Sequence, residues 1–467
     1  MTGPKRDGGS IAAILDRSKA PEPGPLHPSH FPEVERAELP NGIPLLFAST
    51  PGLPVVSISV MVEAGGVREP ADRGGLSVLS SSLLESGAGN RDASAIAEEI
   101  ERLGIQLGVG ASWDLSHLDV TGIRSRIPAA FDILRDLVRE PSFPGDEVER
   151  LRAEQLGSIL QRRAEPRGLA NEMAARFIFS DESPYSRPLS GTTRTVGSLT
   201  RQDVAAFHAT NFTPHGAAVL VAGEIDLEEV LGLASERFGD WSGPAPMPIR
   251  ETVEPRSREL QIVIVDRPGS VQSEIRVGHV SADRATPDYF PIMVMNAILG
   301  GAFSSRLNMN LRERRGFTYG VSSGFVMRRQ PGPFLVSTAV QTEVTADALR
   351  EILHELRTIR QEPVKNAELD DARAYLAGTF PLGLQTTSGV ASRLAEIAAY
   401  GLPLDYFDNY RERILSVDAE RVLTAAHERI LPDSVAIVIV GDAGAVRSAL
   451  EALDLGPIQI IDAKADE

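Results

Sequence analysis

The chain has 467 residues, of which 42% are hydrophobic and 24% are charged, and its formal net charge at pH 7 is −17. This length predicts more than one domain, because a single hydrophobic core rarely serves more than about 250–300 residues. The acidic balance and the lack of a basic stripe argue against nucleic acid as a partner. The absence of cysteine excludes disulfides, thiolate metal sites and cysteine nucleophiles.

The N-terminal stretch, residues 1–37, holds six prolines and little periodicity, which predicts an extended arm. Its apolar run IAAIL is too short for the core of a secretory signal peptide. The longest apolar runs, such as VAIVIV at 435–440, are far below the roughly 20 residues that span a bilayer, so no membrane span is expected. We therefore expect a cytoplasmic protein, or a periplasmic one if a leader precedes this start.

The rest of the chain divides into two halves with the same order of patterns. Apolar strands come first, then long helices of 3.6-residue period, then a strand that ends in Gly and an acidic residue. We predict a first domain over 38–242, a proline-rich linker over 243–259 and a second domain over 260–467.

The two halves also match in detail. PHGAAVLVAGEID at 214–226 and PDSVAIVIVGDAG at 432–444 place their Pro and Gly residues at one constant separation of 218 residues. Thr200 and Asp418 lie at the same separation and are predicted helix N-caps. The repeat indicates an internal duplication.

The whole pattern resembles the insulinase or mitochondrial-processing-peptidase family (M16) of zinc metallopeptidases. The resemblance extends from residue 38 to about 455, and its stretches are LPNGIPLLFAST (39–50), VSISVMVEAGGVREPADRGGLSVLSSSLLE (56–85), NFTPHGAAVLVAGEIDLEEV (211–230) and LRERRGFTYGVSS (311–323). It implies an α+β fold of two homologous domains, each a mainly antiparallel sheet packed against helices and joined by a linker. In the family, such pairs of domains close like a clamshell around a chamber that degrades peptides.

The zinc motif of that family is not present in this chain. Active members carry His-x-x-Glu-His on a helix, where positions i and i+4 share one face and two imidazoles can hold one zinc ion. Laid over GGLSVLSSSLLE, the three motif positions fall on Val78, Ser81 and Ser82. The family's third ligand would fall near Glu154, which without the motif reads as a solvated helix charge. We expect no metal and no cofactor in this chain, and zinc in a partner subunit.

The second half keeps a different pair of residues. In LRERRGFTYGVSS, Arg312 and Tyr319 are seven residues apart, with Gly316 between them as a predicted helix C-cap. The spacing resembles the family's Arg and Tyr pair, which reaches the substrate across the chamber and implies a catalytic role for Arg312 and Tyr319. The alternative is a charged helix end followed by an ordinary strand tyrosine.

The sequence supports neither a serine hydrolase nor a nucleotide-binding protein. GVSSG at 320–324 matches the serine-hydrolase pattern around Ser322, but the sequence after it predicts a strand, a turn and a strand instead of the strand, turn and helix that this chemistry needs. No dinucleotide-binding or P-loop motif is present either.

The expected function is that of a non-zinc helper subunit in a heterodimeric metallopeptidase. This chain would contribute Arg312 and Tyr319, a homologous zinc-bearing subunit would contribute the metal, and unfolded peptides would be the substrate. Two alternatives are a non-proteolytic scaffold subunit and a self-paired pseudoenzyme that binds peptides without cutting them.

Overall fold

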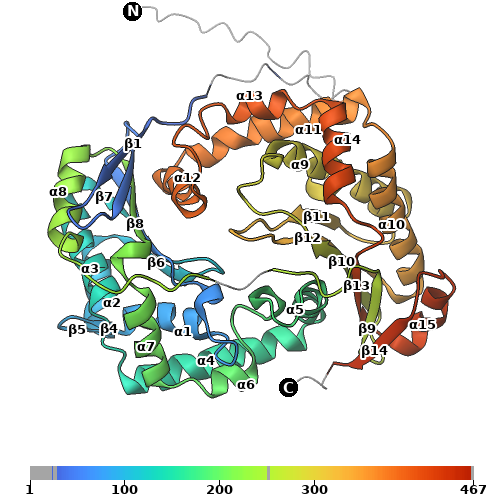
Figure 1. Ribbon diagram of the computed structural model, residues 1–467, viewed down its shortest axis with the longest axis horizontal. Coiled ribbons are helices and arrows are strands. Elements are labelled where there is room, and N and C mark those ends of the chain that lie inside the picture. Colours follow the sequence, from blue (N-terminus) through green and yellow to red (C-terminus); the bar gives the residue numbers. More distant parts are fainter. Residues whose placement is uncertain (1–23, 25–28, 250–252, 464–467) are drawn as a thin grey trace, which may run out of the picture. The chain divides into compact units, whose positions relative to one another are not determined.

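A computed structural model of the protein describes residues 24, 29–249 and 253–463 (Figure 1). Most of the predicted arm therefore lies outside the described residues, as do residues 250–252 of the predicted linker. By their contacts, residues 31–249 and 253–463 belong to one compact unit, the larger of two in the chain. Every helix and strand found in the described residues belongs to the larger unit.

The first sheet has six strands in the order β1-β2-β8-β3-β7-β6 among the described residues. Neighbouring strands are antiparallel except β2 and β8, which run parallel. The first of them begins four residues before the predicted start of the first domain. The strands are β1 Val34–Glu38, β2 Pro44–Ser49, β3 Val55–Val62, β6 Gln106–Ala111, β7 Ser116–Ile123 and β8 Ala217–Gly223.

The second sheet repeats the first strand for strand. Its order is β11-β12-β10-β13-β9-β14, so β10 takes the place of β3, β12 that of β7 and β13 that of β8. One edge differs, because β14 is parallel to β9 whereas β1 is antiparallel to β2. The predicted duplication is thus visible in the topology. The strands are β9 Gln261–Asp266, β10 Gln272–Val280, β11 Val321–Phe325, β12 Pro333–Gln341, β13 Ala436–Gly441 and β14 Ile458–Asp462.

Helices fill the segments between the strands of the first half. Thr200 caps α7 by accepting a hydrogen bond from the Asp203 N–H, which confirms the predicted cap. A short ribbon of β4 (Gly87–Ala88) and β5 (Arg91–Asp92) precedes α2. The helices are α1 Leu76–Ser82, α2 Ala93–Leu103, α3 Ile127–Arg139, α4 Gly145–Ala164, α5 Pro166–Ile178, α6 Thr193–Gly197, α7 Arg201–Asn211 and α8 Leu227–Phe238.

The second half also has helices between its strands, together with two π-helical segments, Ala297–Gly301 and Asn308–Arg314. Asp418 caps α14 as predicted, accepting from the Arg421 N–H. Within residues 29–249 and 253–463, every helix falls short of the length or hydrophobicity that crossing a bilayer requires. The helices are α9 Tyr289–Asn296, α10 Thr345–Gln361, α11 Asn366–Thr379, α12 Thr387–Tyr400, α13 Tyr410–Leu415, α14 Ala419–Arg429 and α15 Ala443–Glu451.

The two halves exchange one helix each. Helix α5 belongs to the first half but packs on β10 and β13 of the second sheet, and α12 of the second half packs on β3 and β8 of the first sheet (Figure 1). Each sheet therefore has one face on the helices of its own half and the other face partly on a helix from the other half.

Side-chain alternation in the strands explains this arrangement. In β13, Val438 and Val440 pack with the α5 residues Met173 and Phe177, whereas Ile439 points to the helices of its own half. Both faces are buried, and this is why the strand reads as the unbroken apolar run VAIVIV. Neither half completes its hydrophobic core without the other.

Candidate functional site

Helix α1 presents a buried row of serines where the family resemblance places a zinc motif. Ser77 and Ser80 are 0% exposed and Ser81 is 1% exposed, so positions i, i+3 and i+4 share one buried face. Val78 is half-buried and Ser82 is exposed. Of the three positions that the sequence assigned to the motif, only Ser81 therefore belongs to this buried face.

Hydrogen bonds tie this face to its surroundings. The Ser77 hydroxyl donates to Glu69 Oε1 at 2.6 Å, and the Ser81 hydroxyl donates to Ser116 Oγ at 3.0 Å. Ser116 in turn donates to the carbonyl of Ala64 at 2.7 Å. The Ser80 hydroxyl is buried and has no partner among the described residues.

These donors do not fit a zinc ion. Zinc sites in proteins are built from imidazole, thiolate and carboxylate groups, and a neutral hydroxyl offers none of these. Glu154, the predicted position of a third ligand, is 66% exposed and pairs with Arg150 on α4. The neighbouring Gln155 is the residue of α4 that reaches α1, donating to the carbonyl of Gly75 at 3.1 Å. No cluster of three or more His, Cys, Asp or Glu residues suited to a metal occurs in the described part of the chain.

An ionisable group that the sequence analysis missed, Glu69, lies beside α1. Glu69 accepts hydrogen bonds from the N–H groups of Gly75 (3.1 Å) and Ser77 (2.7 Å), at the start of the helix. Burial raises the pKa of Glu69 to about 7, although the hydrogen bonds from Ser77 and Gly75 oppose the rise. An acidic residue shortly before a predicted helix start was the only available signal.

The pair Arg312 and Tyr319, in the second half of the chain, lies where a π-helical turn ends. Gly316 adopts the left-handed conformation, with φ of 66°, and its N–H donates to the carbonyl of Arg312 at 3.1 Å. The Phe317 N–H donates to the carbonyl of Leu311 at 2.9 Å, so these two bonds close the turn. Gly316 thus has the capping role that the sequence predicted, and the chain continues from it to Tyr319.

Arg312 and Tyr319 line one cleft of about 470 Å³. Tyr319 is 95% exposed, which leaves its hydroxyl accessible. The Arg312 guanidinium carbon lies 4.5 Å from the centre of the Phe303 ring, and its Nε is 3.5 Å from Glu313 Oε1. The structure thus brings the two predicted residues to one surface and adds Phe303, which the sequence analysis missed.

The floor of this cleft is the open face of the second sheet. Arg276 of β10 is 1% exposed, and its guanidinium donates to Glu274 Oε2 at 2.8 Å and to Asn171 Oδ1 at 2.7 Å. Burial lowers the pKa of Arg276, Glu274 opposes this, and the positive charge of Arg167 adds to the lowering. Arg167 is an exposed residue near the start of α5 and also lines the cleft.

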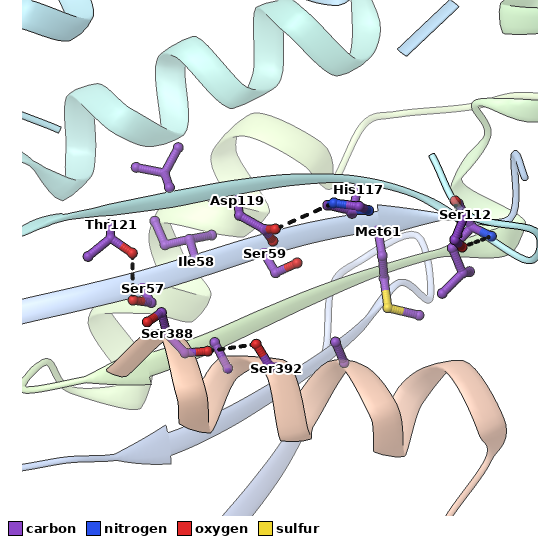
Figure 2. Close-up of a pocket in the computed structure, with 14 residues that line it drawn as sticks. Ser57, Ile58, Ser59, Met61, Ser112, His117, Asp119, Thr121, Ser388 and Ser392 are labelled. Atoms are coloured by element: carbon purple, nitrogen blue, oxygen red, sulfur yellow. Dashed lines mark hydrogen bonds and ion pairs between the residues drawn. The ribbon is translucent and has the colours of Figure 1, made fainter. Parts of the chain in front are cut away.

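The duplication creates a second cleft at the equivalent place in the first half. About 280 Å³ in volume, it lies between the β3 and β7 strands and helix α12 (Figure 2). Ser57 hydrogen-bonds Thr121 and Thr387, each at 2.8 Å, and His117 Nε2 lies 3.7 Å from Asp119 Oδ2. In Figure 2 the hydroxyl groups of the strands and of α12 face this cleft from both sides.

The GVSSG stretch is part of a strand pair and not a nucleophile elbow. Ser322 lies within β11 and pairs with Ser337 of β12, as the sequence predicted for a strand, a turn and a strand. No histidine lines the cleft beside Ser322 among the described residues, so a general base for it is not in place.

Comparisons with known proteins agree with this architecture. The sequence profile of insulinase (Peptidase family M16) matches residues 45–192, and that of the peptidase M16 inactive domain matches residues 198–376. A Mycobacterium tuberculosis protein named as an uncharacterized zinc protease is 27% identical over 376 residues, covering 80% of this chain and 85% of its own. A Helicobacter pylori protein named as a non-peptidase homolog is 22% identical over 403 residues, with 85% and 91% covered.

A solved structure is similar over nearly the whole fold. The crystal structure of a peptidase M16 inactive domain from Pseudomonas fluorescens has a TM-score of 0.82 and 24% identity, and the match covers 88% of this chain and 98% of that one. The chain belongs to the M16 peptidase family, and it lacks the His-x-x-Glu-His motif of the active members.

Proposed function

We propose that this protein is the non-zinc helper subunit of a two-chain metallopeptidase. A homologous partner chain would carry His-x-x-Glu-His and thus the zinc ion and the general base. This chain would contribute part of the chamber wall and the pair Arg312 and Tyr319. The observation that carries the proposal is the contrast between the serine-lined face of α1 and the cleft that keeps both donors together.

The chemistry of the pair suits peptide hydrolysis. A guanidinium and a phenol hydroxyl both donate hydrogen bonds, and such donors stabilise the oxyanion that develops when a peptide carbonyl is attacked. Arg312 is oriented by the Phe303 ring and Tyr319 is exposed at the cleft. Both would therefore be ready to hold a substrate carbonyl without supplying the nucleophile.

Unfolded peptides are the proposed substrates. A chamber shared between two chains admits a flexible segment and excludes a folded domain, so selection would depend mainly on fit. Hydroxyl and amide side chains in the cleft, such as Asn308 and Ser337, could hydrogen-bond an extended backbone.

A structural subunit without peptide chemistry is the second candidate. The name of the Helicobacter pylori relative, a non-peptidase homolog, favours it. A structural subunit does not need Arg312 or Tyr319 for its role. A self-paired pseudoenzyme does not need a zinc-bearing partner. Substitution of the pair therefore separates these candidates from the helper role.

Reconstitution tests the proposal. The purified chain alone is expected to hold no stoichiometric zinc by mass spectrometry and to cut no unfolded peptide, and addition of a zinc-bearing homologue is expected to produce cleavage. The homologue alone serves as the control. Proteolysis by the isolated chain, or tightly held zinc in it, would contradict the helper role.

A further inference from the structure

The cleft that holds Arg312 and Tyr319 has a surplus of positive charge. Three guanidinium groups line it, from Arg167 on α5, Arg276 on β10 and Arg312 on the π-helical turn. Glu274 is the single carboxylate that lines it among the described residues. This local surplus stands out in a chain whose net charge is −17.

Two of the three cations already have partners within the fold. Arg276 is buried and forms an ion pair with Glu274, at 2.8 Å, so these two charges offset each other. Arg312 packs on the Phe303 ring and lies 3.5 Å from Glu313. Their orientations are therefore fixed by the protein itself.

Arg167 is the third cation, and it differs from the other two in its partners. It is exposed, and its guanidinium donates to no acceptor in the part of the chain that the structure describes. Its backbone carbonyl accepts from Arg276 at 3.4 Å, which fixes the start of α5 beside the cleft. This contact brings Arg167 and Arg276 close together, and the positive charge of Arg167 contributes to the lowering of the pKa of Arg276.

We infer that Arg167, which lines the same cleft as Arg312, forms a subsite that binds a carboxylate of the peptide substrate. A guanidinium matches a carboxylate in shape and can donate two parallel hydrogen bonds to it. The carboxylate could belong to an acidic side chain or to the C-terminus of the peptide. This inference rests on the proposed function in one respect, which is that the ligand is a peptide.

The duplicated cleft of the first half offers an internal comparison. It occupies the same position relative to its sheet and to the exchanged helix α12, and its lining contains Asp119 and His117 but no Arg or Lys among the described residues. At the start of α12, Ser388 lines the cleft much as Arg167 does at the start of α5. The basic character is thus specific to the cleft that holds the Arg312 and Tyr319 pair.

Equilibrium binding of fluorescent peptides to the isolated full-length chain tests the inference. Three peptides of one unfolded sequence are used: one with a central Glu and a free C-terminus, one with Gln in its place, and one with an amidated C-terminus. Loss of the responsible carboxylate is expected to weaken binding about tenfold or more. Comparison of the Gln peptide with the amidated peptide identifies which carboxylate is bound.

Variants assign the effect to Arg167. Arg167→Gln is expected to abolish the preference for the carboxylate, and Arg167→Lys to keep part of it. Arg150→Gln, which removes an exposed arginine of α4 outside the cleft, is expected to leave the preference unchanged. Equal affinity for all three peptides, no binding of any of them, or an undiminished preference in Arg167→Gln overturns the inference. This assay measures binding to the chain without its partner. A failure of the helper role would instead be seen in the cleavage assays, so the two outcomes can be distinguished.

Discussion

At the residue scale, Arg312 and Phe303 form the contact on which the orientation of the candidate site depends. The guanidinium carbon lies 4.5 Å from the ring centre, and a cation over an aromatic face is attracted by its quadrupole. Phe303 is itself exposed, so its role is to hold Arg312 and not to fill a core. A donor that is already oriented needs little reorganisation when charge develops on the substrate.

Truncation of the ring should weaken the pair without affecting the fold. Phe303→Ala is expected to lower kcat/KM of the reconstituted peptidase about two- to fivefold, since an exposed cation–π contact contributes about 0.5–1 kcal/mol. Phe303→Tyr retains an aromatic face and serves as the control. A Phe303→Ala variant with unchanged kcat/KM and an unchanged thermal midpoint would show that the ring does not orient Arg312.

Glu69 predicts a pH dependence of stability. Because its pKa is raised to about 7 in the folded chain from 4.5, the unfolded chain releases this proton first, and the free energy of unfolding should fall as pH rises from about 4.5 to 7. The loss is on the order of 3 kcal/mol for a shift of this size. Burial lowers the pKa of His208 and of His279 to about 4, which acts in the opposite direction below pH 6.5.

The Glu69→Gln variant isolates this contribution, since the two histidines are the same in both proteins. Its stability relative to the unmodified protein should rise between pH 5 and pH 8, as measured by denaturant unfolding at both values. If the difference between the two proteins does not change with pH, Glu69 is not the group that titrates.

At the scale of elements, the sequence predicted what depends on local pattern. Strands, the repeat, the caps Thr200 and Asp418 and the turn at Gly316 follow from periodicity and from residue preferences, and each is present. The burial of the motif positions on α1 was not predicted, because a run of serines does not show which of them face inward. Arg167 was missed because it reaches the cleft from a segment far from Arg312 in sequence. Phe303 was missed because a single aromatic residue upstream of Arg312 does not indicate that its ring packs on the guanidinium.

The exchange of α5 and α12 could not be predicted from the sequence either. Amphipathic patterning shows that a helix has a buried face, but it does not show against which sheet that face packs. Both helices connect strands of their own half while they cover a sheet of the other. Only tertiary packing distinguishes this from two separate domains.

The exchange predicts that neither half folds alone. A second half without α5 would expose the valines of β13 that α5 covers, Val438 and Val440. Separately expressed halves, cut within residues 243–249, are expected to aggregate or to bind a hydrophobic dye, and co-expression should yield a soluble complex. A half that unfolds cooperatively as a soluble monomer would contradict this account.

At the scale of the whole molecule, duplication has produced two equivalent clefts that differ in chemistry. The first-half cleft is lined by hydroxyl groups, His117 and Asp119, and the second-half cleft by arginines and Tyr319. If the partner chain binds the zinc ion, as proposed, α1 of this chain does not have to provide zinc ligands. The serines of α1 then need only to pack, and Ser77 and Ser81 also hydrogen-bond to their surroundings.

The measurement that tests the central claim most directly is the turnover of the reconstituted peptidase with Arg312→Ala or Tyr319→Phe in this chain. Loss of one such donor typically costs about 2.7–4 kcal/mol in the transition state, so the predicted fall in kcat is about a hundredfold to a thousandfold. The zinc content of the partner should remain unchanged. Cleavage at the normal rate by both variants would contradict the assignment of these residues.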